Sequence, residues 1–341
     1  NSMKILYIPV TKKIKEKNLK NYLIIFLYDI KIILKNFSFS RKATKNTSGY
    51  IDSAIHSNAF IFELPYNFSR IFSKILNLIF DGIFVNWKFT NIRSDTNDIQ
   101  SKLIELSKKF KIKKVIIDGR DTSSNVINSE ILDRFDYVIK REKNKSISNE
   151  KYLTTMLPCK LIDYKISRHK ENIDWSKIGR STTNDRFEYD IFFSGQQSSE
   201  FRSKLVEFIK NQNFNFYGGV ENSKIPHSQY MDAIYSSSIN LALGGIGEFT
   251  FRHLEILANC SFMICENSIN QLELPIPLKD GKHFVTFDSK EDLLEKIKFY
   301  LKNERSRLDI ALNGRRILEE YYSPKKHGDI ILKKIFSNAK I

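Results

Sequence analysis

The sequence predicts an α/β protein built from two Rossmann-like halves. Three observations carry this prediction. Short β-rich runs alternate with longer helical patterns, the alternation stops at a polar stretch near the middle of the chain, and it then resumes. The length of 341 residues agrees, since a single hydrophobic core rarely serves more than about 250–300 residues. With 41% hydrophobic residues, the composition supplies packed cores and excludes a disordered chain.

In the first half, runs rich in β-branched and aromatic residues predict strands, and longer runs with one apolar face predict helices. The strands are expected at Lys4–Val10, Ala59–Leu64, Gly82–Trp87, Lys114–Asp118 and Tyr137–Lys140. The helices are expected at Leu23–Leu34, Phe68–Ile79 and Ile99–Phe110. Because the two kinds of run alternate, we expect the strands to lie parallel in one sheet.

The polar stretch SRHKENIDWSKIGRSTTNDRFE, at 167–188, lacks periodicity and predicts a connection between domains. After it, strands are expected at Asp190–Ser194, Phe214–Tyr217, Ile239–Leu243, Phe262–Cys265 and His283–Phe287. Helices are expected near Ser199–Asn211, Ser228–Ser236, Glu248–Asn259, Lys290–Asn303 and Arg305–Tyr321. We therefore expect an N-terminal domain at 3–170, a linker at 171–189, a C-terminal domain at 190–322 and a final helix at 323–341.

The charge balance favours an anionic partner. The chain has 55 Lys and Arg residues against 39 Asp and Glu residues, for a net charge of +16, which suits nucleic acid, an acidic membrane surface or a phosphorylated substrate.

The Cys residues of the chain (Cys159, Cys260 and Cys265) lack metal-like spacing, and their odd number argues against a disulfide framework. A reducing, cytoplasmic location fits best. MKILYIPV leads directly into a charged run and predicts no signal peptide.

Three strands of the second half run into glycines. Gly195 follows the first, Gly218 and Gly219 end the second, and a turn with Gly245 and Gly247 follows the third. Since the carboxyl ends of parallel strands meet at one edge of a sheet, these turns predict a ligand crevice there. Each turn is also typical of ordinary chain reversal, and the spacing is not the dinucleotide-binding fingerprint.

The run after the third turn predicts a helix that begins at Glu248, with Arg252 and Glu255 on one face. A helix N-terminus and a guanidinium suit a diphosphate, and a carboxylate suits the two hydroxyls of a ribose. The alternative is a structural Arg–Glu pair on a solvated surface. His227 and His253, nearby in sequence, are more typical of a loop and of packing than of catalysis.

In the first half, DGRDTSSN places Asp118 and Asp121 at a strand end, where a carboxylate can act as general base on an acceptor hydroxyl. The alternative is an Asx-turn or a helix cap made by Asp121 or Ser123. His56 is a weaker candidate for the base. The sequence contains no Asp-x-Asp, so we expect no metal and no cofactor other than an activated co-substrate.

Residues 225–332, from IPHSQYMDAIY to HGDIIL, resemble the donor-binding half of GT-B glycosyltransferases of the family-1/4-like group, including CgeB-type proteins. The shared features run in order: the strand region AIYSSSINLAL, the Arg-x-x-Glu helix, the small-residue turn before FMICE, the strand KHFVTFDS and a paired terminal helix. The first half resembles no family that we can name.

The resemblance implies a GT-B fold whose two domains face a central cleft, and metal-independent sugar transfer from a nucleotide sugar to an acceptor hydroxyl. It implies Glu255 at the ribose and Arg252 near the phosphates. The residues expected to bind the nucleotide sugar are Gly195, Gly218, Gly245, Gly247, Glu248, Arg252 and Glu255. The common retaining pattern has two glutamates eight apart, but Glu248 and Glu255 are seven apart, which leaves the role of Glu248 and the stereochemistry open.

The basic surplus suggests an acceptor carried on an anionic glycan or glycolipid of a bacterial cell surface, reached at the inner face of the plasma membrane. Runs such as KKFKIKK are also typical of ordinary solvated surfaces. Two alternatives stay open: a GT-B-like protein that binds or modifies nucleic acid, and an inert scaffold that keeps the fold. No zinc spacing or RNA-recognition motif favours the first of these.

Overall fold

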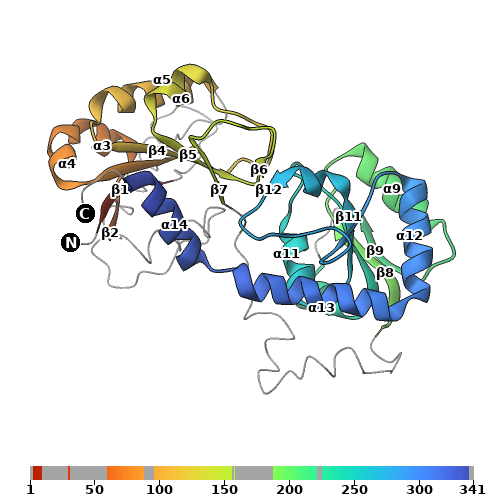
Figure 1. The fold of residues 1–341 in the computed structure, drawn as a ribbon. Coiled ribbons are helices and arrows are strands. Elements are labelled where there is room, and N and C mark those ends of the chain that lie inside the picture. The colour runs from red at the N-terminus through yellow and green to blue at the C-terminus, as the bar shows by residue number, and fades with distance from the viewer. Residues whose placement is uncertain are drawn as a thin grey trace. The chain divides into compact units, whose positions relative to one another are not determined.

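A computed structural model describes residues 3–9, 60–87, 96–155, 187–220 and 225–337, together with residues 30 and 157. The chain forms two compact units, one made of Asn1–Met156 with Ser323–Ile341 and the other of Leu157–Tyr322. Each unit contains a parallel sheet with helices on both faces (Figure 1). The expected α/β class with two Rossmann-like domains is therefore confirmed.

The first unit has a six-stranded sheet in the order β2-β1-β3-β4-β5-β7, and every pair is parallel. Its strands are β1 Lys4–Ile8, β2 Phe60–Glu63, β3 Gly82–Asn86, β4 Lys113–Asp118, β5 Tyr137–Arg141, the short β6 Lys143–Asn144 and β7 Tyr152–Thr155. Its helices are α3 Tyr66–Ile71, α4 Ser73–Ile79, α5 Thr96–Lys109, α6 Ser129–Arg134 and α14 Pro324–Phe336.

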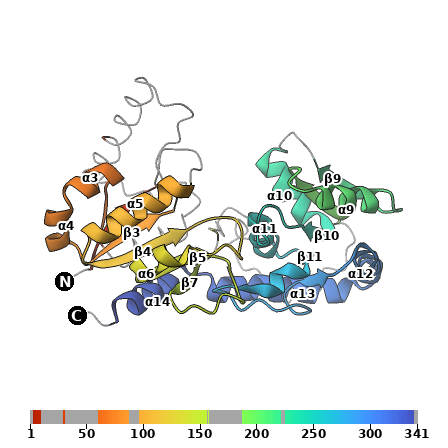
Figure 2. The ribbon, with the colours of Figure 1, turned by 90° about the horizontal axis from the view of Figure 1, so that it is seen from above.

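Alternating residues of this sheet fill two cores, because successive side chains of a strand point to opposite faces. Leu6 and Ile83 belong to the core under α3 to α6, whereas Ile5 and Phe84 belong to the core on the other face. There α14 supplies Ile331, Leu332, Ile335 and Phe336. Figure 2 shows α14 and α5 on opposite faces of the sheet.

The second unit has a five-stranded parallel sheet in the order β13-β11-β10-β8-β9. Its strands are β8 Tyr189–Gly195, β9 Phe216–Val220, β10 Ser237–Ala242, β11 Met263–Glu266, the short β12 Leu272–Glu273 and β13 Val285–Phe287. Its helices are α9 Glu200–Lys210, α10 His227–Tyr235, α11 Phe251–Ala258, the 3-10 helix η3 Asn267–Gln271, α12 Lys290–Lys302 and α13 Glu304–Tyr321.

The strand order of the second sheet reverses at its first strand. The chain passes from β8 to β9 on one side and then returns to place β10 on the other side of β8. The helices that follow these strands cover opposite faces: α9 packs in the core with Ile191 and Phe193, whereas α10 contacts Phe192 through Tyr230. Such a reversal leaves a crevice at the carboxyl ends of the two central strands, where open α/β sheets bind ligands.

Several local predictions from the sequence are wrong. The helix expected over Phe68–Ile79 is two helices, because the backbone of Phe72 leaves helical geometry at φ −90° and ψ 12°. The strand β7 and the six-residue α6 were not predicted. The helix α6 begins where the side chain of Asn128 caps the N–H of Glu130 at 2.8 Å. The expected helix Leu23–Leu34 and most of the expected linker 171–189 lie outside the described residues.

Candidate functional site

The candidate site lies at the carboxyl edge of the second sheet. The end of β8, the turn after β10 and the end of β11 bring Gly195, Gly244 and Glu266 to this edge. Arg202 comes from α9 and Arg252 from α11, the helices that follow the two central strands. Two guanidinium groups therefore lie at the edge of the sheet where the topology predicts a crevice.

Both guanidinium groups lie over the aromatic ring of Phe193. The Cζ atom of Arg252 is 4.5 Å from the ring centroid, and the Cζ atom of Arg202 is 5.7 Å away. Arg252 donates from Nη2 to the carbonyl of Ser194 at the end of β8. Arg202 donates from Nη1 to the carbonyl of Gln196 at 2.8 Å and from Nη2 to that of Leu243 at 3.1 Å. Backbone carbonyls thus fix both groups in position.

The electrostatics of this pair favour an anion. Burial and the positive charge of Arg252 lower the pKa of Arg202 to about 10, so that Arg202 remains charged at neutral pH. The Nε atoms of Arg202 and Arg252 are buried and have no hydrogen-bond partner among the described residues. The two like charges repel each other, and Glu266 and Glu255 offset this repulsion only in part, so an anion bound beside the guanidinium groups is favoured.

Glu255 is held by Tyr230 of α10. The Tyr230 hydroxyl donates to Oε2 of Glu255 at 3.0 Å, and Tyr230 also lies beside Arg252. Burial raises the pKa of Glu255, although the Tyr230 hydrogen bond and the charge of Arg252 oppose this shift. The ring of His227 stacks on that of Tyr230 with centroids 6.4 Å apart. The structure therefore brings Arg252, Glu255 and His227 together around one tyrosine.

The glycines at this edge have different roles. A Cβ atom on Gly195 would lie 2.9 Å from Nη2 of Arg252, so glycine makes room for the guanidinium. Gly245 donates its N–H to the carbonyl of Gly247 at 2.9 Å and so closes the turn after β10. Gly218 lies inside β9 with φ at +91°, and a Cβ there would be 2.1 Å from the carbonyl oxygen of Phe193. The positive φ and the close pairing of β9 with β8 therefore require a glycine at position 218.

The helix expected to begin at Glu248 begins at Phe251, and Glu248 lies in the preceding turn. Thr250 caps the helix, and its N–H donates to Nδ1 of His253 at 3.0 Å. His253 is fully buried and stacks on Phe249, with ring centroids 4.8 Å apart. Burial lowers the pKa of His253 to about 3, so the ring stays neutral and accepts this bond. His253 thus sets where the helix starts.

Arg202 and Glu266 also belong to the candidate site, and neither was predicted from the sequence. Arg202 lies on the buried face of α9 with Leu205, Val206 and Ile209, so an arginine in an otherwise apolar helical stripe was the available signal. Glu266 accepts the N–H of Gly244 at 3.0 Å and so ties the end of β11 to the glycine turn. Burial raises the pKa of Glu266, and the Gly244 bond and Arg202 oppose this shift.

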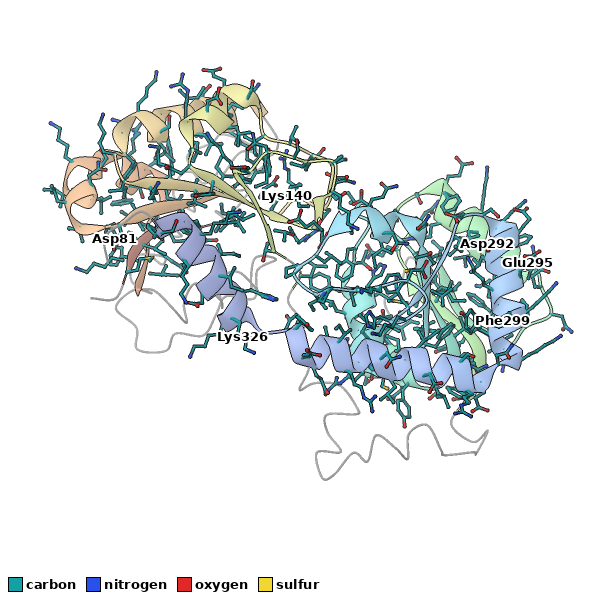
Figure 3. All side chains as sticks on the ribbon, viewed as in Figure 1. Asp81, Lys140, Asp292, Glu295, Phe299 and Lys326 are labelled. Atoms are coloured by element: carbon teal, nitrogen blue, oxygen red, sulfur yellow. The ribbon has the colours of Figure 1, made fainter. Side chains whose placement is uncertain are left out.

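In the first unit, Asp118 is fully buried at the end of β4. Arg120 donates from Nε and Nη2 to the two carboxylate oxygens of Asp118, each at 2.8 Å. Nζ of the fully buried Lys140, which is labelled in Figure 3, lies 3.4 Å from Oδ2 of Asp118. Burial opposes ionisation, but the Arg120 hydrogen bonds and the charge of Lys140 outweigh it and lower the pKa of Asp118. The Arg120 guanidinium lies 4.4 Å from the ring centroid of Trp87.

Asp121 is separate from this buried cluster. Its side chain is 45% exposed and pairs with Nη2 of Arg141. The two expected candidates for a base therefore differ: Asp118 is enclosed by two cations, and Asp121 is accessible to a substrate. The third candidate, His56, lies outside the described residues.

Within the described ranges, no cluster of three or more His, Cys, Asp and Glu residues has the grouping of a metal site. In the same part of the chain, no helix combines the length and apolar character required to cross a membrane.

Residues 200–332 match the model of a family described as glycosyl transferase-like. The fold is similar to that of HepE from Anabaena, solved in complex with UDP, with a TM-score of 0.52 at 10% identity over 98% of this chain and 100% of that chain. It is also similar to sucrose-phosphate synthase from Thermosynechococcus elongatus, with a TM-score of 0.51 at 8% identity over 99% and 100% of the two chains. No curated protein matches the sequence. The solved structures confirm the GT-B fold expected from the sequence, and the family match places a glycosyl transferase-like domain at residues 200–332.

Proposed function

We propose that the chain transfers a sugar from a uridine-diphosphate sugar to an acceptor hydroxyl. The observation that carries this proposal is the pair of guanidinium groups, Arg202 and Arg252, held over Phe193 where the strand order reverses. A similarly folded protein, HepE, was solved in complex with UDP and in complex with UDP and glucose, which supports uracil as the base of the donor.

The diphosphate is proposed to bind the two arginines. A guanidinium donates two parallel hydrogen bonds to phosphate oxygens, and each arginine has a buried Nε without a partner among the described residues. Gly195, Gly245 and Gly247 allow the backbone to approach the phosphates closely. As the bond to the sugar breaks, negative charge grows on the leaving UDP, and the fixed positive charges stabilise it without a metal ion.

The ribose is proposed to bind Glu255. Tyr230 fixes Oε2 of this carboxylate at 3.0 Å and orients the other oxygen toward a ribose hydroxyl. His227 lies at the start of α10, next to Tyr230, and is proposed to contact the same end of the nucleotide. Glu248, in the turn before α11, is proposed to contact the sugar or its phosphate.

The first unit is proposed to bind the acceptor and, if the reaction inverts the anomeric centre, to supply the base. Asp121 suits this role better than Asp118, because its side chain is 45% exposed whereas that of Asp118 is fully enclosed by Arg120 and Lys140. The net charge of +16 supports an anionic or lipid-linked glycan of the bacterial cell surface as acceptor, reached from the cytoplasmic face of the membrane.

The proposal is tested by measuring thermal unfolding with UDP, GDP, CMP and ADP and with their sugars. We expect UDP and UDP sugars to raise the melting temperature of the wild type with EDTA present, and Arg252→Met and Glu255→Gln to lose this shift. Arg316→Met on α13 and Glu295→Gln on α12 remove exposed charges elsewhere in the same unit and should keep it.

If no nucleotide raises the melting temperature, the inert-scaffold alternative holds. Salt-sensitive binding of duplex DNA without any response to nucleotide sugars would instead favour the nucleic-acid alternative. Either result overturns the proposed transfer.

A further inference from the structure

The helices α3 and α4 of the first unit expose a continuous apolar stripe. Its members recur at the three- and four-residue spacing of one helical face, even across the break at Phe72. They are Ile71, Phe72, Ile75, Leu78 and Ile79, and we refer to them as the α3–α4 face. Leu78 is 88% exposed and Ile71 is 66% exposed. Scattered exposed apolar residues are normal, but five of them within nine residues form a patch.

This stripe is not the side of the helix that packs on the protein core. The core side of α4 is formed by Ser73 and Leu76, and Phe80, which follows the helix, is buried in the same core. The helix is therefore apolar on both sides, with Lys74 and Asn77 between them. A helix that is apolar on both sides is typical of one whose outer side is also covered, and an exposed apolar patch of this kind marks a site of protein or membrane contact.

Basic residues border the α3–α4 face. The Asn77 side chain donates from Nδ2 to the carbonyl of Lys109 at 2.9 Å and accepts the N–H of Lys111 at 2.8 Å. These two bonds hold the last turn of α5, with exposed Lys108 and Lys109, and the exposed Lys111 that follows it alongside α4. Lys74 on α4 is also exposed.

Two acidic residues described near this border, Glu105 and Asp81, both accept hydrogen bonds. Glu105 accepts a hydrogen bond from Tyr66 at 2.5 Å and lies 3.7 Å from Arg70, and Asp81 accepts the N–H of Lys4 at 2.7 Å (Figure 3). The border therefore has a surplus of positive charge around an apolar centre.

We propose that the α3–α4 face docks on a bilayer that contains anionic lipids. Aliphatic side chains of a helix lying in the interface enter the acyl region, and long lysine side chains reach the headgroups from its edge. A second copy of the chain fits less well, because it would bring the same positive border against itself. The α3–α4 face is thus the surface for the membrane contact in the proposed function, and the inference rests on that membrane contact. It does not depend on nucleotide binding, which is proposed to involve residues of the other unit only.

The inference is tested by sedimenting the full chain with vesicles of phosphatidylcholine alone and of phosphatidylcholine with phosphatidylglycerol. We expect binding to the mixed vesicles and much weaker binding to the neutral ones. The double variant Ile75→Gln with Leu78→Gln should bind the mixed vesicles about tenfold more weakly, since both side chains contribute to the buried apolar area. The triple variant Lys108→Gln, Lys109→Gln and Lys111→Gln should lose a similar factor, about tenfold, at low salt.

Matched controls keep the test specific. Phe299→Gln on α12 removes a side chain that is 54% exposed in the other unit, and Lys282→Gln, Lys298→Gln and Lys302→Gln remove three exposed charges there. Both controls should bind the mixed vesicles as the wild type does. All variants should keep the melting-temperature shift with UDP, so loss of vesicle binding is distinguishable from failure of the proposed transfer.

Two results would overturn the inference. One is equal vesicle binding by the wild type, the Ile75/Leu78 variant and the lysine variant. The other is no vesicle binding together with a concentration-dependent dimer that the Ile75/Leu78 variant loses in sedimentation velocity, which would assign the face to a second copy.

Discussion

Replacing Asp118 with Asn removes the negative charge from a fully buried ion cluster of the first unit. The two 2.8 Å bonds from Arg120 lose their charged acceptor, and Lys140, which is also fully buried, loses its counter-charge at 3.4 Å. Breaking a buried pair by removing one partner costs about 3–5 kcal/mol, because the remaining charge stays desolvated. For a domain of this size we expect the melting temperature to fall by roughly 10 °C.

The matched comparison is Asp121→Asn, three residues along the chain. Its side chain is 45% exposed, and surface ion pairs contribute only about 0–1 kcal/mol. We therefore expect nearly unchanged stability and, if Asp121 is the base, a large loss of kcat with little change in nucleotide affinity. The assay is urea unfolding followed by circular dichroism, with transfer rates measured on the folded variants. Wild-type stability in Asp118→Asn would refute the reasoning.

The same cluster predicts a dependence of stability on pH. The Arg120 bonds and Lys140 lower the pKa of Asp118 in the folded state, despite the opposing effect of burial. Its contribution to stability is therefore present above the pKa of the unfolded chain, about 3.9, and is lost as the pH falls through the folded value. We expect Asp118→Asn to lose less stability than the wild type on acidification below about pH 4.

Three further predictions concern the second unit. Gly195→Ala places a Cβ atom 2.9 Å from Nη2 of Arg252 and should weaken UDP binding about tenfold by displacing the guanidinium. Unchanged UDP affinity in calorimetry would argue against the close approach of Arg252 to Gly195. Arg202→Met should also weaken UDP binding by roughly ten- to a hundredfold, with a shallower dependence on salt than the wild type, because one charge-assisted contact is lost. Burial lowers the pKa of His253 to about 3, so the wild type should lose roughly 2 kcal/mol of unfolding free energy between pH 7 and pH 5, as the unfolded chain binds a proton that the folded chain excludes. His253→Gln should lack this part of the decrease, and identical pH profiles in urea unfolding would contradict the burial argument.

Much of the sheet architecture was predictable from the sequence. Strands such as Gly82–Asn86 and Tyr189–Gly195 are short, apolar and bounded by turn residues, so alternation with helical patterns located them. Two elements were missed, the six-residue α6 and the four-residue β7. The start of α11 was misplaced because Glu248 looks like a first-turn acid, whereas the bond between Thr250 and His253 decides the boundary.

The candidate site was predictable only in part. Arg252 and Glu255 were found because their spacing puts them on one helical face, but the partners that orient them lie far away in sequence. Tyr230 precedes Glu255 by 25 residues, and Ser194 precedes Arg252 by 58. For the same reason, the sequence did not distinguish Asp118 from Asp121, since the burial of Asp118 depends on Lys140 from the neighbouring strand.

The central claim is that Arg252 and Glu255 hold the nucleotide at the carboxyl edge of the second sheet. It is tested most directly by titrating UDP into the wild type, Arg252→Met and Glu255→Ala in a calorimeter, with melting temperatures measured alongside. We predict that the wild type binds UDP, and that each variant binds at least about tenfold more weakly while its melting temperature without ligand stays close to that of the wild type. Wild-type affinity in both folded variants would contradict the account.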